Sequence, residues 1–363
     1  MRVVVIGAFG NFGSRIATRL AQEPGFEIIA TSRRPNGNGN FPSIESARLD
    51  INSRTFAADL KTLKSDLVIH CAGPYQGQDY RVALASLACG ANYIDIADGR
   101  DFVAGFVGAV GPAAERAERF AITGASTLPA LSSAVVDSLK ESFASLDAID
   151  IVIAPGQQAP RGAATVAGVL GYAGKPFKWW LDGAWRTVYG WQELKTEHFS
   201  FGSRLAAACD VPDLELLPAR YPGVRTVTFR AALEVSLQHY GLWLMAVLRR
   251  VGLPIPMHAL SGGFDRIGTW LNWLGSDIGG MTVRVAGKDK AGAGIYRTWE
   301  IVAGNNHGLE IPCMAAVILA NRQGHGEAFL PGAKVCMGIL KLQEFELEFK
   351  RWDMSTRVHM ESS

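Results

Sequence analysis

A glycine-rich turn close to the N-terminus restricts the possible folds of this chain more than any other feature. It follows Arg2–Ile6, a run of mainly β-branched residues, and leads into Asn11–Gln22, where apolar residues recur at helical spacing. The turn reads Gly7-Ala8-Phe9-Gly10-Asn11-Phe12-Gly13. Glycines at such a junction permit a tight turn, a close backbone approach to a ligand, and packing of the helix on the strand. The junction therefore predicts a strand–turn–helix unit at the start of a parallel sheet.

The alternation of strand and helix continues to about residue 130. The predicted strands are Arg2–Ile6, Glu27–Thr31, a short one ending at Leu49-Asp50, Leu67–Cys71, Tyr93–Ile96 and Phe120–Thr123. The predicted helices are Asn11–Gln22, Arg54–Leu63, Tyr80–Cys89 and Ala113–Arg119, and a polar loop is expected at Pro35–Asn40. The strands are mostly continuous apolar runs, which is typical of a parallel sheet covered on both faces. We predict that residues 1–130 form a doubly wound Rossmann domain of the α/β class.

The remaining residues have a different character, because all nine tryptophans lie between Trp179 and Trp352. The predicted strands here are Ile149–Ala154, Thr226–Ala231, Met281–Ala286 and Tyr296–Ala303, the last two pairing across the loop Gly287–Gly294. We predict a Trp-rich α+β domain for substrate binding or dimerisation over residues 131–304, and with it a homodimer. Residues 305–363 are expected to return as a helix, Met314–Gln323, and an edge strand, Phe345–Phe349.

The glycine turn and the helix after it predict a dinucleotide site. The N-terminus of a helix offers unpaired N–H groups and a partial positive charge, both of which suit a pyrophosphate. The expected contacts are Gly7, Phe9, Gly10, Asn11, Phe12 and Gly13. The alternative is that the glycines serve packing alone.

The end of the second predicted strand indicates which dinucleotide is bound. A carboxylate is expected there when the ribose 2′-hydroxyl is recognised. This chain has Ser32, Arg33 and Arg34 instead. Two guanidinium groups can pair bidentately with a 2′-phosphate, so the sequence predicts NADP(H) rather than NAD(H). The alternative is a pair of solvated surface arginines.

Charge and motif content exclude several classes of function. The 36 basic and 34 acidic residues leave a net charge of +2, which argues against a nucleic-acid partner. We find no metal-binding motif of His and Cys, no phosphate loop of the Walker type and no nucleophile elbow. The expected partner is a small-molecule substrate, and no metal is expected.

Cysteine use and hydropathy bear on location. The five cysteines are widely spaced and odd in number, which favours free thiols and a cytoplasmic protein. No run of about 18 apolar residues is present, so no transmembrane segment is expected. Two aromatic, apolar segments, Tyr240–Leu248 and Trp270–Leu274, are compatible with weak peripheral contact with a membrane. A buried helix or a dimer face is the alternative.

Three segments resemble the saccharopine dehydrogenase-like oxidoreductases. They are Val3 to Gly13 with the glycine turn, His70-Cys71-Ala72-Gly73-Pro74-Tyr75, and Ala91-Asn92-Tyr93-Ile94-Asp95-Ile96. The resemblance implies a Rossmann domain that carries NAD(P), with an α+β domain inserted before a C-terminal return segment. It also implies that Ala72, Gly73 and Pro74 line the ribose and nicotinamide side of the cofactor. Asp50 either accepts a hydrogen bond from the adenine amino group or caps the next helix.

One departure from the family pattern concerns the substrate. Relatives often have an acid where this chain has Arg100, in Asp98-Gly99-Arg100-Asp101. Arg100 is a candidate for binding a substrate carboxylate, and an internal pair with Asp98 or Asp101 is the alternative. The candidates for moving a proton are Tyr75, Asp98 and His307, because each follows a strand end or lies where the chain returns. Asp95 is expected to be a structural anchor.

The resemblance leads to an NADP(H)-dependent oxidoreductase as the expected function. The family favours hydride transfer at a C–N bond of an amino-acid-derived substrate. The first alternative is reduction of a C=C or C=O bond on an apolar, lipid-like substrate, suggested by the aromatic second domain. The second is a non-catalytic NADP-binding protein, suggested by the altered segment at Arg100.

Overall fold

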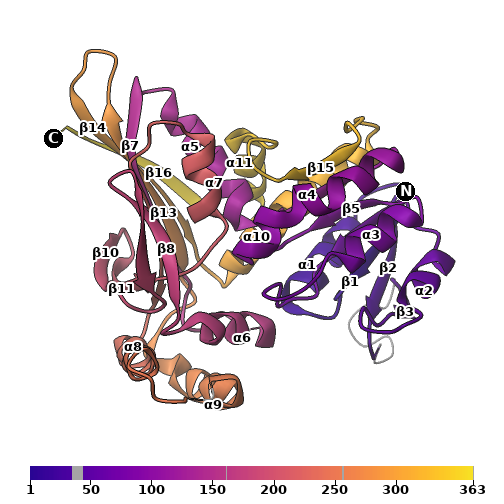
Figure 1. Cartoon of the computed structure of the whole chain (residues 1–363), viewed down its shortest axis with the longest axis horizontal. Coiled ribbons are helices and arrows are strands. Elements are labelled where there is room, and N and C mark those ends of the chain that lie inside the picture. Colours follow the sequence, from indigo (N-terminus) through magenta and orange to yellow (C-terminus); the bar gives the residue numbers. More distant parts are fainter. Residues whose placement is uncertain (35–43, 161, 256, 363) are drawn as a thin grey trace. The chain divides into compact units, whose positions relative to one another are not determined.

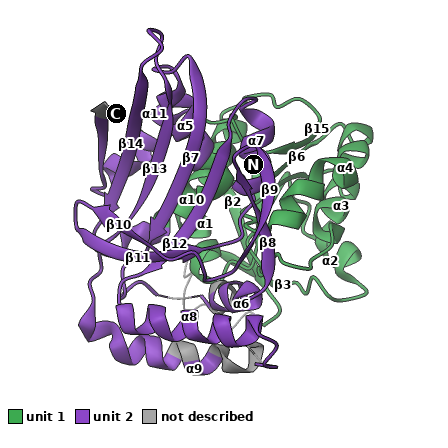
Figure 2. Cartoon of the chain, turned by 60° about the vertical axis from the view of Figure 1, so that its left-hand side comes forward, with its two compact units in different colours: residues 1–131, 310–340 green, residues 132–309, 341–363 purple. Residues whose placement is uncertain are grey.

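The computed structural model of the protein describes residues 1–34, 44–160, 162–255 and 257–362 (Figure 1). The predicted loop Pro35–Asn40 lies outside the described residues. The chain forms two compact units, coloured separately in Figure 2. Unit 1 contains residues 1–131 and 310–340, and unit 2 contains residues 132–309 and 341–363.

Unit 1 is a Rossmann α/β fold, as predicted. Its parallel sheet has the order β15-β6-β5-β4-β1-β2-β3. The strands are β1 (Arg2–Ile6), β2 (Glu27–Ser32), β3 (Glu45–Arg48), β4 (Leu67–His70), β5 (Asn92–Asp95), β6 (Phe120–Thr123) and β15 (Gly332–Val335). The helices are α1 (Asn11–Leu20), α2 (Phe56–Thr62), α3 (Arg81–Ala88), α4 (Arg100–Arg116), the short turn η1 (Thr127–Leu131) and α10 (Ile311–Gly324). The strand order reverses between β1 and β4, where folds of this class bind their ligands.

The returning helix α10 supports the start of α1, which carries the glycine turn. The two helices pack together, and Arg15 on α1 forms an ion pair with Glu310 at the start of α10. The Cys313 thiol also lies 3.6 Å from the carbonyl oxygen of Phe12. A segment some 300 residues away in the chain therefore helps to hold the predicted ligand site in place.

Unit 2 is built on a mixed sheet in the order β10-β11-β12-β7-β13-β14-β16, with β8 and β9 attached to β12. The strands are β7 (Ser145–Ala154), β8 (Pro176–Leu181), β9 (Ala184–Tyr189), β10 (Lys195–Phe199), β11 (Gly202–Ala208), β12 (Thr226–Leu233), β13 (Gly279–Lys288), β14 (Gly294–Ala303) and β16 (Ser355–Ser362). The helices are α5 (Ser132–Lys140), α6 (Ala163–Tyr172), α7 (Asp213–Arg220), α8 (Ser236–Arg250), α9 (Met257–Trp270), η2 (Leu271–Leu274), η3 (His307–Glu310) and α11 (Leu342–Arg351). The predicted pairing across Gly287–Gly294 is confirmed, because β13 and β14 form an antiparallel hairpin there.

One predicted element was wrong, and the bounds of another were misplaced. Phe345–Phe349 is part of the helix α11 and not an edge strand. Leu342, Phe345 and Phe349 are buried at helical spacing, and the short alternating stretch hid this longer period. The edge strand of this region is β16, which pairs with β14. The helix predicted at Ala113–Arg119 is the end of α4, which begins at Arg100.

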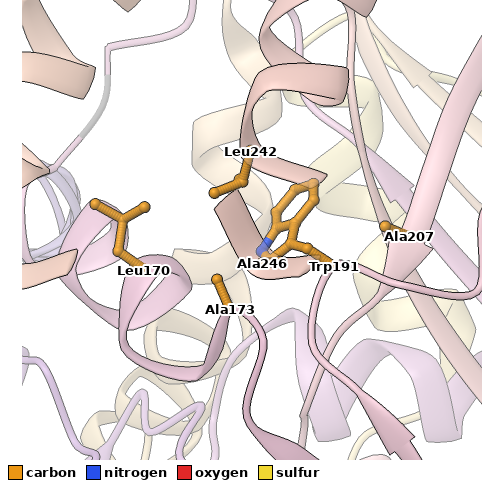
Figure 3. Close-up of a cluster of buried hydrophobic side chains, with 6 residues drawn as sticks. All are labelled: Leu170, Ala173, Trp191, Ala207, Leu242 and Ala246. Carbon is orange, nitrogen blue, oxygen red and sulfur yellow. The ribbon is translucent and has the colours of Figure 1, made fainter. Parts of the chain in front are cut away.

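A buried apolar cluster joins α6 and α8 to the sheet of unit 2 (Figure 3). Its fully buried members are Leu170, Ala173, Trp191, Ala207, Leu242 and Ala246. The Trp191 ring also makes an edge contact with the buried His239, at 5.2 Å between ring centroids. This packing explains part of the tryptophan bias of the second half of the chain.

Candidate cofactor-binding site

The glycine turn between β1 and α1 is held by contacts that leave no room for side chains at two positions. Gly7 has a φ of +79°, and a Cβ there would lie 2.9 Å from the backbone nitrogen of Ala72. A Cβ on Gly13 would lie 2.3 Å from the carbonyl oxygen of Gly7. The N–H groups of Gly7 and Ala8 both donate to the carbonyl of Thr31, which ties the turn to β2. The turn is therefore rigid, and its shape requires glycine.

The first turn of α1 is arranged to accept an anion. Its N-cap is Gly10, and no side chain caps the helix. The first turn also carries no acidic residue. The N–H groups at the start of a helix have no acceptor within the helix, so a glycine N-cap leaves them open to an external oxygen. These features fit the pyrophosphate of a dinucleotide.

The turn after β4 lies directly against the glycine turn. Gly73–Pro74 is a cis peptide bond, and Gln78 donates from Nε2 to the carbonyls of Ala72 (2.8 Å) and Pro74 (2.7 Å). Because Gly7 touches the backbone of Ala72, the two turns meet at the point where the strand order reverses. Gln78 was not singled out from the sequence, and only its contacts reveal that it holds this turn.

A cavity of about 890 Å³ opens at the ends of β2 and β3. It is lined by Phe9, Ser32, Arg33, Arg34, Arg48 and Asp50. Among the described residues, no carboxylate pairs with any of the three arginines. The Ser32 hydroxyl is buried and has no hydrogen-bond partner in the described part of the chain. Three cations and a hydroxyl that lack partners within the described ranges fit a phosphate group.

Arg48 is a residue of this cavity that sequence reasoning missed. It is opposite Ser32 in the parallel pairing of β2 with β3, and the N–H of Leu49 donates to the carbonyl of Ser32. Only this register brings Arg48 beside Arg33 and Arg34. The only local feature that could have indicated Arg48 as a cavity residue is its basic side chain at the end of a short strand.

Asp50 lines the cavity and does not cap α2. Its Oδ1 accepts a hydrogen bond of 3.0 Å from the N–H of Asn52, while the N-cap of α2 is Thr55. The capping alternative is therefore excluded, and the carboxylate stays at the edge of the cavity.

Beneath the turn after β4 lies a group of buried polar side chains. The Tyr75 hydroxyl donates to the carbonyl of His70 at 2.6 Å, and His70 Nδ1 lies 3.0 Å from the Tyr93 hydroxyl. Burial lowers the pKa of His70 to about 4, so the imidazole is neutral at physiological pH. Burial also raises the pKa of Tyr75 well above its ordinary value. This places Tyr75 as a support of the turn.

Asp95 at the end of β5 anchors the neighbouring turn. Its Oδ1 accepts hydrogen bonds from the N–H groups of Ala97 (3.0 Å) and Gly124 (2.8 Å) and from the Thr123 hydroxyl (2.8 Å). Burial raises the pKa of Asp95 to about 6, although these hydrogen bonds act in the opposite direction. The expected structural role of Asp95 agrees with these contacts.

Asp98 and Arg100 lie on the turn between β5 and α4, next to the turn after β4. A Cβ on Gly99 would lie 3.3 Å from the Cβ of Tyr75, so the two turns are in contact. The Asp98 side chain is exposed, yet desolvation by the surrounding protein raises the pKa of its carboxyl. A hydrogen bond from the Gln76 side chain opposes this rise. Arg100 is half-buried at the first position of α4.

His307 lies in unit 2, at the start of η3. Its Nδ1 pairs with the carbonyl oxygen of Trp352 at 2.9 Å, and its ring makes an edge contact with the Trp352 ring. The remaining candidates, Tyr75, Asp98 and Arg100, are all in unit 1.

The first part of the chain is similar to one family of known proteins. Residues 3–137 match the model of the saccharopine dehydrogenase NADP binding domain. None of the curated protein sequences matches the chain at a significant level.

Solved structures extend the likeness of the fold to nearly the whole chain. Saccharopine dehydrogenase (L-Glu forming) from Saccharomyces cerevisiae is 13% identical with a TM-score of 0.70, covering 99% of this chain and 100% of that one. Homospermidine synthase from Legionella pneumophila, solved with NAD, is 10% identical with a TM-score of 0.66, covering 99% and 91%. An engineered D-amino acid dehydrogenase bound to NADP+ is 15% identical with a TM-score of 0.52, covering 94% of each chain.

Proposed function

We propose that this protein is an NADP(H)-dependent oxidoreductase, because residues 3–137 match the model of the saccharopine dehydrogenase NADP binding domain. The observation that carries the choice of NADP(H) is the cavity at the ends of β2 and β3, with Arg33, Arg34 and Arg48 around the unsatisfied hydroxyl of Ser32. A 2′-phosphate supplies the acceptor oxygens that these four side chains need.

The cofactor is expected to lie across the two turns at the reversal of strand order. The glycine turn at Gly7, Phe9 and Gly10 lets the pyrophosphate approach the backbone, and the start of α1 at Asn11, Phe12 and Gly13 faces it. Ala72, Gly73 and Pro74 border the ribose and the nicotinamide, and Asp50 accepts from the adenine amino group. When bound, NADP(H) supplies or accepts the hydride. Every step other than hydride transfer must be carried out by side chains of this protein.

For the reaction we propose hydride transfer at a C–N bond of an amino-acid-derived substrate. Two of the similar structures are named for amino acids, one as L-Glu forming and one as a D-amino acid dehydrogenase. Arg100 has a guanidinium that can bind a substrate carboxylate bidentately. Asp98 is the proposed proton donor and acceptor, because its carboxyl is exposed and desolvation raises its pKa above the ordinary value. Tyr75 is a positioning residue for the turn, and His307 is the rival proton carrier.

The direct test of the cofactor is a pair of titrations with NADPH and NADH, followed by fluorescence. We expect the wild-type protein to bind NADPH at least about tenfold more tightly, and the R33Q/R34Q variant to lose that preference. NADH binding should stay unchanged. Equal affinity of the wild type for the two cofactors would refute the proposal.

The reaction is tested by screening amino acids and keto acid–amine pairs for NADPH oxidation or NADP+ reduction. With an active pair in hand, D98N is expected to lower kcat about 100-fold and to remove a limb of the pH profile, while H307Q leaves both unchanged. R100Q is expected to raise KM more than it lowers kcat. If H307Q removes the limb and D98N does not, the assignment of Asp98 fails.

A second candidate function is reduction of a C=C or C=O bond on a lipid-like substrate. The observation in its favour is the large apolar surface that unit 2 exposes on α8, α9 and η2. Activity of the same preparation with an enone or a ketone of long chain, and none with amino acids, would select it. Absence of turnover with every class, together with intact NADPH binding, would indicate a non-catalytic NADP-binding protein. The homodimer and the cytoplasmic location stay predictions.

A further inference from the structure

The helix α8 is apolar on two opposite sides, and only one of them is buried. His239, Leu242 and Ala246 face the core of unit 2, where the last two belong to the cluster of Figure 3. On the other side, Leu237 and Leu244 keep 71% and 50% of their surface exposed. A surface helix of a water-soluble protein normally has a polar outer side. The outer side of α8 is therefore a candidate contact surface.

The exposed apolar surface continues through the next helix and turn. Trp270 and Trp273 each keep 72% of their surface exposed, and Ile267 keeps 57%. Among the described residues, nine of the eighteen exposed large hydrophobic side chains lie between Leu237 and Leu274. Figures 1 and 2 both show α8 and α9 side by side at one end of unit 2. We name the outer surface formed by Leu237, Tyr240, Leu244, Ile267, Trp270 and Trp273 the α8–α9 face.

The charged residues of α8, α9 and η2 indicate what kind of partner would bind the α8–α9 face. Residues 236–274 contain three arginines and a single acid, Asp265. The Arg249 guanidinium is engaged, because it donates to the carbonyl of Ala173 at 2.9 Å at the end of α6. Arg250 and Arg266 are exposed, Arg250 over the ring of Tyr189. Residues 236–274 therefore combine exposed tryptophans and leucines with two exposed cations, one on each helix.

We propose that the α8–α9 face binds the surface of a bilayer that contains anionic lipids. Tryptophan and tyrosine rings favour the headgroup level, leucine side chains enter the acyl boundary, and arginines pair with anionic headgroups. Symmetric pairing with a second copy would bring together two segments that each have more arginines than acids. Among the described residues, no helix is long and apolar enough to cross a bilayer. The helices thus lie in the interface plane and hold unit 2 against the membrane.

The test is flotation of the purified full-length protein with vesicles of phosphatidylcholine alone or mixed with phosphatidylglycerol. We expect binding to the mixed vesicles and a blue shift of tryptophan fluorescence on binding. The W270S/W273S variant should bind at least about tenfold more weakly and lose the shift. R250Q/R266Q should bind about tenfold more weakly and approach the binding seen with phosphatidylcholine alone. The matched control is L330S/L347S, which removes two side chains that are equally exposed elsewhere.

Two results would overturn the proposal. One is binding of W270S/W273S at the level of the wild type. The other is the absence of vesicle binding together with a dimer in sedimentation equilibrium that the same variant converts to a monomer, which would assign the face to a second copy. Thermal unfolding of each variant, compared with L330S/L347S, shows that a loss of binding does not come from unfolding. NADPH titration of the same samples keeps the outcome separate from that of the proposed function.

Discussion

Two carboxylates, the buried Asp95 in unit 1 and the half-buried Asp150 in unit 2, have opposite surroundings. Asp95 is surrounded by neutral N–H and O–H donors, and burial raises its pKa to about 6. Asp150 on β7 pairs with Lys195 at 2.6 Å and with Arg230 at 3.1 Å. Burial alone would raise the pKa of Asp150, but these cations outweigh it and lower the pKa below the ordinary value.

The difference illustrates two uses of cations in this protein. Unit 2 pairs them internally across its sheet, since Arg284 and Lys195 also contact the buried Glu197. Unit 1 anchors its carboxylate with neutral donors and keeps Arg33, Arg34 and Arg48 at a cavity. Cations that are satisfied within the fold serve stability, whereas cations at an open cavity are available to a ligand.

The largest loss of NADPH affinity and stability is expected from a substitution in the glycine turn of unit 1. In G13A the new Cβ would collide with the Gly7 carbonyl oxygen, so the turn must shift. We expect NADPH affinity to fall by about 100-fold and stability by about 1–3 kcal/mol. The control G108A adds a Cβ on α4 with no atom within 4 Å and should be neutral or stabilising by up to about 1 kcal/mol. Unchanged NADPH binding by G13A would contradict the site.

The next largest effect is a loss of stability when the ion pairs of unit 2 are broken. D150N leaves Lys195, Arg230 and Arg284 without their shared carboxylate and should cost about 2–3 kcal/mol in chemical denaturation. NADPH affinity should not change. Since the folded pKa of Asp150 lies below its unfolded value, its contribution is present above about pH 4 and is lost as the pH falls through the folded pKa. D182N, at an exposed pair with Arg186, should cost no more than about 0.5 kcal/mol.

The opposite pH dependence is expected of Asp95. Its folded pKa of about 6 exceeds the unfolded value near 4, so the folded state binds more protons between these pH values. The wild type should lose about 2 kcal/mol of stability from Asp95 as the pH rises through that window. D95N should remove this slope, whereas E118Q, at an exposed acid, should keep it. If the stability of D95N depends on pH as steeply as that of the wild type, Asp95 is not the titrating group.

The smallest effect is expected on cofactor binding, from a substitution of one arginine in the cavity. R48Q removes one of the three cations and should weaken NADPH binding about tenfold, with NADH binding unchanged. Isothermal titration with both cofactors measures this. R54Q, which removes an exposed arginine outside the cavity lining, should leave both affinities as they are. Equal losses for NADPH and NADH in R48Q would mean that Arg48 does not recognise the 2′-phosphate.

The elements that were predicted correctly from the sequence are those determined by residues within one short segment. The strand, glycine turn and first helix follow from hydrophobic period and from residues within one short segment, and Gly7 and Gly13 have the close contacts that the motif requires. The hairpin of β13 and β14 is likewise set by two apolar runs and the loop between them. The family resemblance over the first 135 residues rested on such segments, and residues 3–137 match that family.

Local sequence was therefore enough to predict the Rossmann unit, its glycine turn and the basic end of β2. Only the tertiary structure decided that Arg48 faces Ser32, that Phe345–Phe349 is helical, and that α8 keeps one apolar side uncovered. Each of these depends on which distant segment pairs with or covers the residue. A strand register or a buried helix side is chosen by the total burial and hydrogen bonding of segments far apart in the chain, and no local window contains that information.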